Sequence, residues 1–147
     1  MSLRHIDGPI VLEIPSDPCG LFLVRSLMER LSQRLGFSES MVRQMVLAVD
    51  EACTNVIRHA YEQLPGKRIV LTFLIREELL EIQVRDFGKP PDPDALKPRD
   101  LRDVRPGGLG LHFIQSAMDE IRYEAPPEGG GLLTMVKYRE RDEAGPK

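Results

Sequence analysis

The sequence has little of what membrane-spanning or secreted proteins need. Its longest apolar runs, such as "LLTMV" and "MVLAV", are far shorter than the roughly 18 residues that cross a bilayer. The first residues, "MSLRHIDGP", contain no apolar segment of the kind found in signal peptides. We therefore expect a cytoplasmic protein with no membrane partner.

Cysteine and basic charge are also scarce. The only two cysteines, Cys19 and Cys53, have no CxxC spacing and fall in predicted helices, so we expect small buried thiols and no disulfide or zinc site. The chain has 20 Lys and Arg against 23 Asp and Glu, a net charge of -3. This balance lacks the basic excess of nucleic-acid-binding proteins, and we expect no direct nucleic-acid partner.

What is present suits one folded domain. The chain has 147 residues, of which 41% are apolar and 29% charged, which is enough for one hydrophobic core. The sequence has no internal repeat, and no linker divides it into two parts of different composition. We expect a single domain over residues 1–147, with residues 141–147 as a solvated tail.

Hydrophobic periodicity predicts helices interspersed with hairpins. Asp17 and Pro18 are typical of a helix start, Gly36 of its end, and Ser38 of a second helix start. In chain order we predict a strand at 10–15, helices at 18–35 and 39–60, a hairpin at 67–88, a helix at 108–121 and strands at 121–125 and 131–140. This order predicts an α+β fold, a two-layer α/β sandwich whose mixed, mostly antiparallel sheet carries the helices on one face.

The segment between Lys89 and Gly108 differs from the rest. It is rich in Pro, Asp, Arg and Gly and has little periodicity. A segment of this length without regular structure inside a compact domain predicts a functional loop or lid.

The stretch "VDEACTNVIRHAY", residues 49–61, places four polar side chains on a predicted helix. At 100° per residue, Glu51, Asn55, Arg58 and His59 would share one narrow sector. One explanation is a solvated face on which Glu51 pairs with Arg58 and Asn55 with His59. The other is that a carboxylate and an amide one turn apart serve Mg²⁺, or a base beside a metal ligand. The stripe alone does not decide between them.

Three further motifs follow, and each also has an ordinary structural explanation. In "VRDFG", Asp86 and Gly88 end a strand, where an acid before a flexible turn can accept hydrogen bonds from a ligand amine. "GGLGL", residues 107–111, opens a helix whose first N–H groups can bind an anion. Residues 129–131 are all glycine and precede a strand that contains Thr134, the ordinary pattern of a hairpin turn.

The order of these motifs resembles the ATP-binding domain shared by gyrase, Hsp90, histidine kinases and MutL, the Bergerat fold. Within that superfamily the chain is similar to the anti-sigma factor serine/threonine kinases. "DEACTNVIRHAY" resembles their N-box, "RDFGKPPDP" their first glycine box and "GGLGLHFI" their second. The resemblance covers about residues 8–140. One departure is that Lys89 and Pro90 stand where the fuller superfamily pattern has a second glycine, which stiffens the base of the lid and leaves turnover open.

The resemblance implies a role for each motif residue. Glu51 would be the general base for a substrate hydroxyl, and Asn55 would coordinate Mg²⁺ and bridge it to the ATP phosphates. Asp86 would accept from the adenine amino group, with Thr134 in the same polar network. The implied nucleotide-binding residues are Asn55, Arg58, Asp86, Gly88, Gly108, Leu109, Gly110, Leu111 and Thr134.

The implied activity is that of an ATP- and Mg²⁺-dependent serine/threonine protein kinase. As an anti-sigma factor it would phosphorylate a STAS-domain anti-anti-sigma factor, sequester a sigma factor and form a homodimer. The sequence has neither a Walker loop nor an HRD motif, so P-loop and eukaryotic-type kinases are excluded. Two alternatives remain: a non-catalytic ATP- or partner-binding switch module of the same fold, and a regulatory domain that works with a larger signalling protein.

Overall fold

The computed structural model describes residues 6–90 and 108–140, with side chains from 112 onward in the second range. Most of the predicted lid and the predicted tail lie outside these residues. The elements are β1 (Ile10–Pro15), a 3₁₀ turn η1 (Pro18–Gly20), α1 (Leu21–Arg34), α2 (Glu39–Asn55), a π-helical segment η2 (Val56–Ala60), β2 (Arg68–Ile75), β3 (Leu79–Asp86), α3 (Gly108–Ala117), β4 (Glu120–Glu124) and β5 (Gly131–Tyr138).

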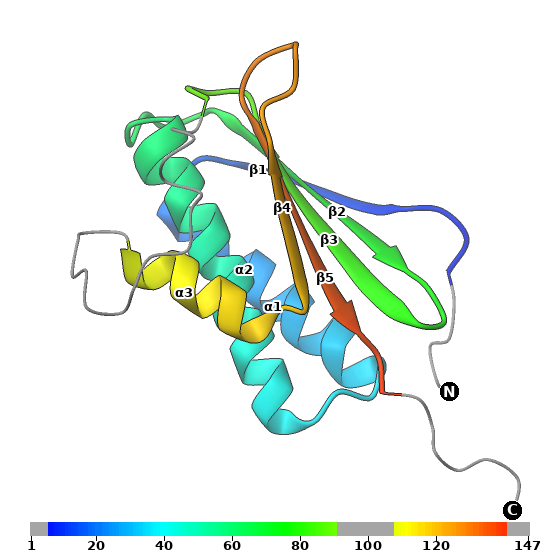
Figure 1. The fold of residues 1–147 in the computed structure, drawn as a ribbon. Coiled ribbons are helices and arrows are strands. Elements are labelled where there is room, and N and C mark those ends of the chain that lie inside the picture. The colour runs from blue at the N-terminus through cyan, green and yellow to red at the C-terminus, as the bar shows by residue number, and fades with distance from the viewer. Residues whose placement is uncertain (1–5, 91–107, 141–147) are drawn as a thin grey trace, which may run out of the picture.

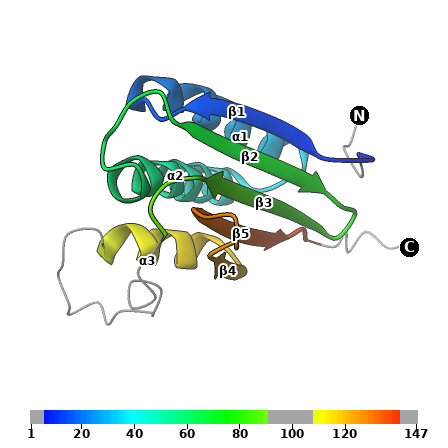
Figure 2. The same ribbon diagram turned by 90° about the horizontal axis from the view of Figure 1, so that it is seen from above.

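The five strands form one sheet in the order β1-β2-β3-β5-β4, and each pair of neighbours is antiparallel. The helices lie on one face of this sheet (Figures 1 and 2), with α2 in contact with both α1 and α3. The predicted two-layer α+β fold is confirmed. Strand β1 lies at an edge of the sheet, where Pro15 ends it without interrupting a central ladder.

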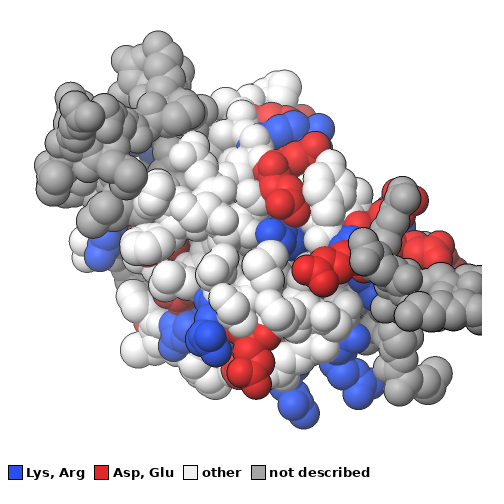
Figure 3. All heavy atoms as spheres, turned by 60° about the horizontal axis from the view of Figure 1, so that its bottom comes forward, with Lys and Arg blue, Asp and Glu red and all other residues white. Residues whose placement is uncertain are grey.

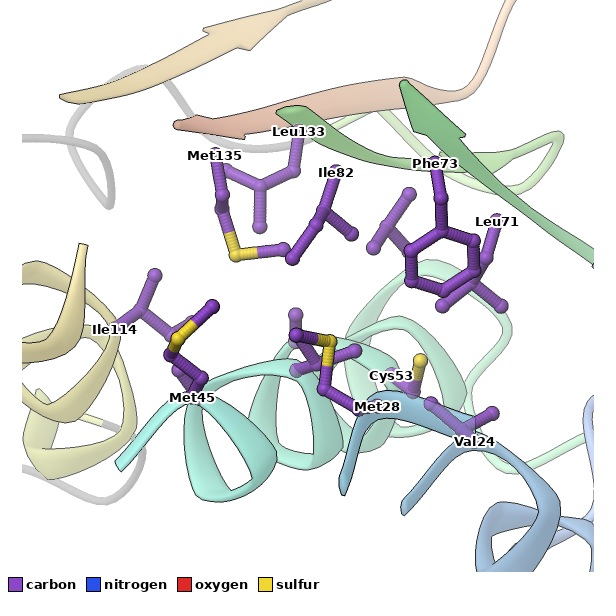
Figure 4. Packing of buried hydrophobic residues seen from close by; sticks show 14 of the residues in the cluster. Val24, Met28, Met45, Cys53, Leu71, Phe73, Ile82, Ile114, Leu133 and Met135 are labelled. Atoms are coloured by element: carbon purple, nitrogen blue, oxygen red, sulfur yellow. The ribbon is translucent and has the colours of Figure 1, made fainter. Parts of the chain in front are cut away.

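The core lies between the sheet and the helices. On β2, Ile69, Leu71 and Phe73 are buried and the residues between them are not, because successive side chains of a strand point to opposite faces. Figure 4 shows side chains of β2, β3 and β5 pointing toward Met28 of α1 and Met45 of α2. Full burial of one such side chain is worth about 1.5–3 kcal/mol.

The two helix starts behave nearly as the sequence predicts. The Met41 N–H donates to Ser38 Oγ at 3.2 Å and caps α2. Asp17 accepts from the Cys19 N–H at 2.9 Å, but the turn it caps is 3₁₀ and α1 begins only at Leu21. One expectation about cysteine was wrong, because Cys19 is exposed. Cys53 is buried in the core, and this burial raises the pKa of its thiol to about 12.

The second helix is not a regular α-helix to residue 60 as predicted. After Asn55 the chain forms a π-helical turn, in which the Tyr61 N–H donates to the Val56 carbonyl at 3.0 Å. Glu62 and Gln63 then take positive φ angles and end the helix. A π-turn preserves the apolar spacing only loosely, so periodicity cannot distinguish it from an α-turn.

The third helix is shorter than predicted. It ends at Ala117, and Ile121 lies in β4. Ile121 is half-buried and packs against the core from the strand. An apolar residue at that spacing satisfies both periodicities, so the pattern alone could not place the boundary.

The surface carries charges of both signs. On the face shown in Figure 3, acidic and basic side chains are interspersed around a broad uncharged area. None of the described helices is long and apolar enough to cross a membrane.

Candidate functional site

The C-terminal end of α2 meets the turn that follows β3. In Figure 1 both lie at the same end of the molecule, beside the β4–β5 hairpin. The Lys89 N–H donates to the Ala60 carbonyl at 2.8 Å and joins this turn to η2. Two sequence motifs that are almost thirty residues apart, the N-box and the first glycine box, are therefore in direct contact.

Asp86 lies at this junction and is only 1% exposed. Its carboxylate accepts from the Gly88 N–H at 3.0 Å and from the Gly131 N–H. Burial raises the pKa of Asp86 above its usual value, while these two N–H groups and the Arg85 guanidinium act in the opposite direction. Because burial removes this carboxylate from water, a ligand amine that donates to it would replace part of the lost hydration.

Gly88 is required here for space. A Cβ at this position would overlap the Ala60 carbonyl oxygen and lie 2.7 Å from its carbon and 2.8 Å from Tyr61 Cδ1. Because backbone cannot rotate away, we expect Gly88→Ala to lower the free energy of unfolding by about 2 kcal/mol and to weaken nucleotide binding. Urea unfolding checks this.

The matched control is Gly20→Ala. Gly20 has an ordinary helical φ of -82 and nothing within 4 Å of an added Cβ, so the same methyl group should leave stability nearly unchanged. Equal stability of both variants would show that the Gly88 turn does not need its close approach to η2.

The Asp86 turn is held by residues that the sequence did not suggest. The Tyr61 hydroxyl accepts from the Phe87 N–H at 2.8 Å and donates to the Arg68 carbonyl. Arg85 donates to the carbonyl of Asp86 and, at 3.2 Å, to that of Gly131. The Arg68 and Arg85 guanidiniums lie 4.8 and 4.5 Å from the centre of the Phe87 ring. Only the fold brings these groups together.

Glu51 and Asn55 lie one turn apart in the regular part of α2, and both are half-buried. The Asn55 Oδ1 atom is buried and has no hydrogen-bond partner among the residues that the structure describes. Among the described residues Glu51 forms no ion pair, so the predicted pairing with Arg58 is absent. An unpartnered amide oxygen is a suitable ligand for Mg²⁺, which usually takes one or two protein oxygens together with phosphates and water. In the described part of the chain no three His, Cys, Asp or Glu side chains are grouped to hold a metal.

Arg58 and His59 lie beyond the regular part of α2 that holds Glu51 and Asn55. Both belong to η2 and both are exposed. The prediction of one narrow polar sector depended on α-helical spacing, and the wider π-turn removes that spacing after Asn55.

Thr134 lies on the opposite face of the sheet from Asp86. It pairs with Gln83, whereas Asp86 pairs with Gly131, and alternation along β3 puts Asp86 on the helix-covered face with Val84. Thr134 is 3% exposed, but the structure does not bring it to the Asp86 carboxylate. The neighbours on that face are Leu133 and, from β4, Tyr123.

The "GGLGL" motif starts α3. The backbone of Gly108, Leu109, Gly110 and Leu111 forms its first turn, while their side chains lie outside the described residues. Helix α3 packs against α2. Its first N–H groups have no partner within the helix, as at any helix start, and so can bind an anion.

Comparison with known proteins agrees with this geometry. Residues 14–137 match the family described as "Histidine kinase-like ATPase domain". "Serine-protein kinase RsbW" of Halalkalibacterium halodurans is 33% identical, over 95% of this chain and 88% of the relative. The protein of the same name from Bacillus subtilis is 30% identical, over 88% and 84% of the two chains.

A solved structure is similar in fold. It contains the RsbU and RsbW domains of Rv1364c from Mycobacterium tuberculosis, with a TM-score of 0.63 and 18% identity over 90% of this chain. This chain spans 32% of that longer one. The comparisons show that the chain belongs to the histidine kinase-like ATPase domain family and, within it, to the RsbW serine-protein kinases.

Proposed function

We propose that this protein is a cytoplasmic, ATP-dependent serine/threonine kinase that acts as an anti-sigma factor. It phosphorylates a STAS-domain anti-anti-sigma factor and otherwise sequesters a sigma factor. The observation that carries this proposal is the pair of uncommitted oxygens on α2. The Glu51 carboxylate lies one turn from the buried Asn55 Oδ1, and neither has a partner among the described residues.

Nucleotide binding would depend on Asp86 and the two helix ends. The buried Asp86 carboxylate would accept from the adenine amino group, in a turn whose close approach to η2 depends on Gly88. The first turn of α3 would donate N–H groups to the phosphates. Arg58 is exposed in η2, which follows α2, and its guanidinium would donate to a phosphate.

Asn55 Oδ1 would hold Mg²⁺ against the phosphates. When bound, the ion supplies charge neutralisation of the transferring phosphoryl group. Glu51 would accept the proton of the partner's serine hydroxyl as that oxygen attacks the γ-phosphorus and the bond from phosphorus to the β,γ-bridging oxygen breaks. General-base assistance of this kind is worth about 10²–10⁴-fold in rate.

Partner binding is supported by apolar side chains on the helical layer. Phe22 and Leu23 of α1 are 54% and 48% exposed, and Leu47 of α2 is 46% exposed. Large exposed apolar side chains are typical of surfaces that other proteins cover. A sigma factor, a STAS domain or a second copy of the chain could use this layer, and we propose a homodimer.

The test is phosphate transfer from γ-labelled ATP to STAS-domain proteins of the same genome, each with a matched Ser/Thr→Ala variant at its acceptor. We expect Mg²⁺-dependent label on one STAS protein, lost in its Ala variant and with EDTA. The fixed lid base, where the Lys89 N–H is bonded to Ala60, favours a second candidate, a switch module that binds ATP without turnover. Tight ATP binding with no labelled STAS protein would establish that candidate instead.

A further inference from the structure

The family resemblance implied that Thr134 places a hydroxyl near the carboxylate that recognises adenine. In the structure, however, Thr134 is on the other face of the sheet from Asp86. The question is whether another hydroxyl reaches the Asp86 carboxylate on the helix-covered face.

Tyr123 has the required position. It lies in β4 opposite Leu133 of β5, is half-buried and packs against the core. Gly131 pairs directly with Asp86, and a Cβ at Gly131 would lie 3.0 Å from Asp86 Oδ2 and 3.3 Å from the Tyr123 hydroxyl oxygen. The phenol and the carboxylate therefore both lie close to Gly131, where a side chain would crowd them.

The state of the Tyr123 hydroxyl is also informative. Burial, together with the negative charge of Asp86, raises its pKa to about 12, so it remains a protonated donor at neutral pH. Within the part of the chain that the structure describes, it has no hydrogen-bond partner. The Tyr123 hydroxyl is a half-buried donor with no acceptor among the described residues, and it lies beside a buried carboxylate that accepts from two backbone N–H groups and has further lone pairs. This combination suits a ligand that offers one acceptor and one donor.

Adenine offers this combination. Its amino group is a donor, and the ring nitrogens on either side of it are acceptors, whereas guanine carries a carbonyl oxygen in place of the amino group. We infer that Tyr123 is a specificity-determining residue whose hydroxyl donates to a ring nitrogen flanking the adenine amino group, while Asp86 accepts from that amino group. The inference rests on the proposed nucleotide binding and refines it.

The experiment measures binding of ATP, GTP, 1-deaza-ATP and 7-deaza-ATP by calorimetry to wild type and Tyr123→Phe. We expect Tyr123→Phe to lower ATP affinity about 3- to 10-fold, the effect of one hydrogen bond. Wild type should bind the analogue that lacks the bonded nitrogen more weakly than ATP by a similar factor. Tyr123→Phe should bind that analogue no more weakly than ATP. GTP should bind weakly to both.

Controls separate this role from a structural one. Tyr138→Phe removes a hydroxyl that bonds to Glu120 at 2.8 Å on the exposed part of β5 and should leave ATP affinity unchanged. Tyr123→Phe should unfold like wild type without nucleotide, because its hydroxyl has no described partner. Unchanged ATP affinity in Tyr123→Phe, or an equal loss of affinity for ATP and both analogues, would overturn the role of Tyr123 but leave the proposed function standing. If wild type binds no ATP, the proposed function fails with it.

Discussion

Replacing Glu51 with Gln is expected to lower phosphate transfer by about 10²–10⁴-fold, the usual contribution of a general base, while ATP affinity changes little. Gln keeps the size of the side chain but cannot take the proton of the attacking hydroxyl. Glu51 is half-buried and has no ion pair among the described residues, so its loss should not disturb the fold. Single-turnover transfer at saturating ATP, beside calorimetric ATP binding, measures both quantities.

Asp50→Asn is the matched control. Asp50 is the preceding carboxylate on α2, but it bonds to Arg25 of α1 at 2.8 Å and is thereby committed to joining the two helices. We expect this variant to keep transfer within a few-fold of wild type, with a small loss of stability typical of a partly exposed ion pair. If Glu51→Gln transferred phosphate as well as Asp50→Asn, the assignment of Glu51 as the base would fail.

Asn55→Ala is expected to weaken ATP binding by about 10- to 100-fold in the presence of Mg²⁺, equivalent to about 1.4–2.7 kcal/mol, and to reduce transfer with it. Without nucleotide, however, the variant should be as stable as wild type or more so. The reason is that Asn55 Oδ1 is a buried acceptor with no partner in the described part of the chain, a destabilising feature that Ala removes. Residues that serve binding often carry such a penalty in the free protein.

Titration of ATP with and without EDTA, beside urea unfolding of the nucleotide-free protein, tests both parts. Chelation should weaken ATP binding to wild type and have little effect on Asn55→Ala. Thr54→Ala, which removes a hydroxyl that donates to the Asp50 carbonyl at 2.9 Å, is the neighbouring control and should retain Mg²⁺-dependent binding. A large loss of stability in Asn55→Ala would mean that the amide has a structural role.

Local sequence signals determined much of the fold. The Ser38 cap, the apolar spacing of α1 and α2 and the β2–β3 hairpin were all predictable, because each depends on residues a few positions apart. The errors lie where two local patterns are equally compatible with the residues. The π-turn after Asn55 and the early end of α3 at Ala117 are both of this kind.

The candidate site divides in the same way. The order of the motifs indicated a family, and the resemblance to that family implied roles for Glu51, Asn55, Asp86 and Gly88. The family is confirmed by the comparisons. Which hydroxyl faces Asp86 depends on strand register, and a shift of one residue moves a side chain to the other face. Sequence alone therefore put forward Thr134, whereas the structure has Tyr123 there.

The sequence by itself determined the class of fold, the order of its elements and the acidic and amide residues of α2, since all of these are set by local periodicity and short motifs. Only the tertiary structure decided that the Asp86 turn is bonded to Ala60 and Tyr61 and that Tyr123 borders Asp86. These relations join residues far apart in the chain, and their distances follow from the packing of the helices on the sheet.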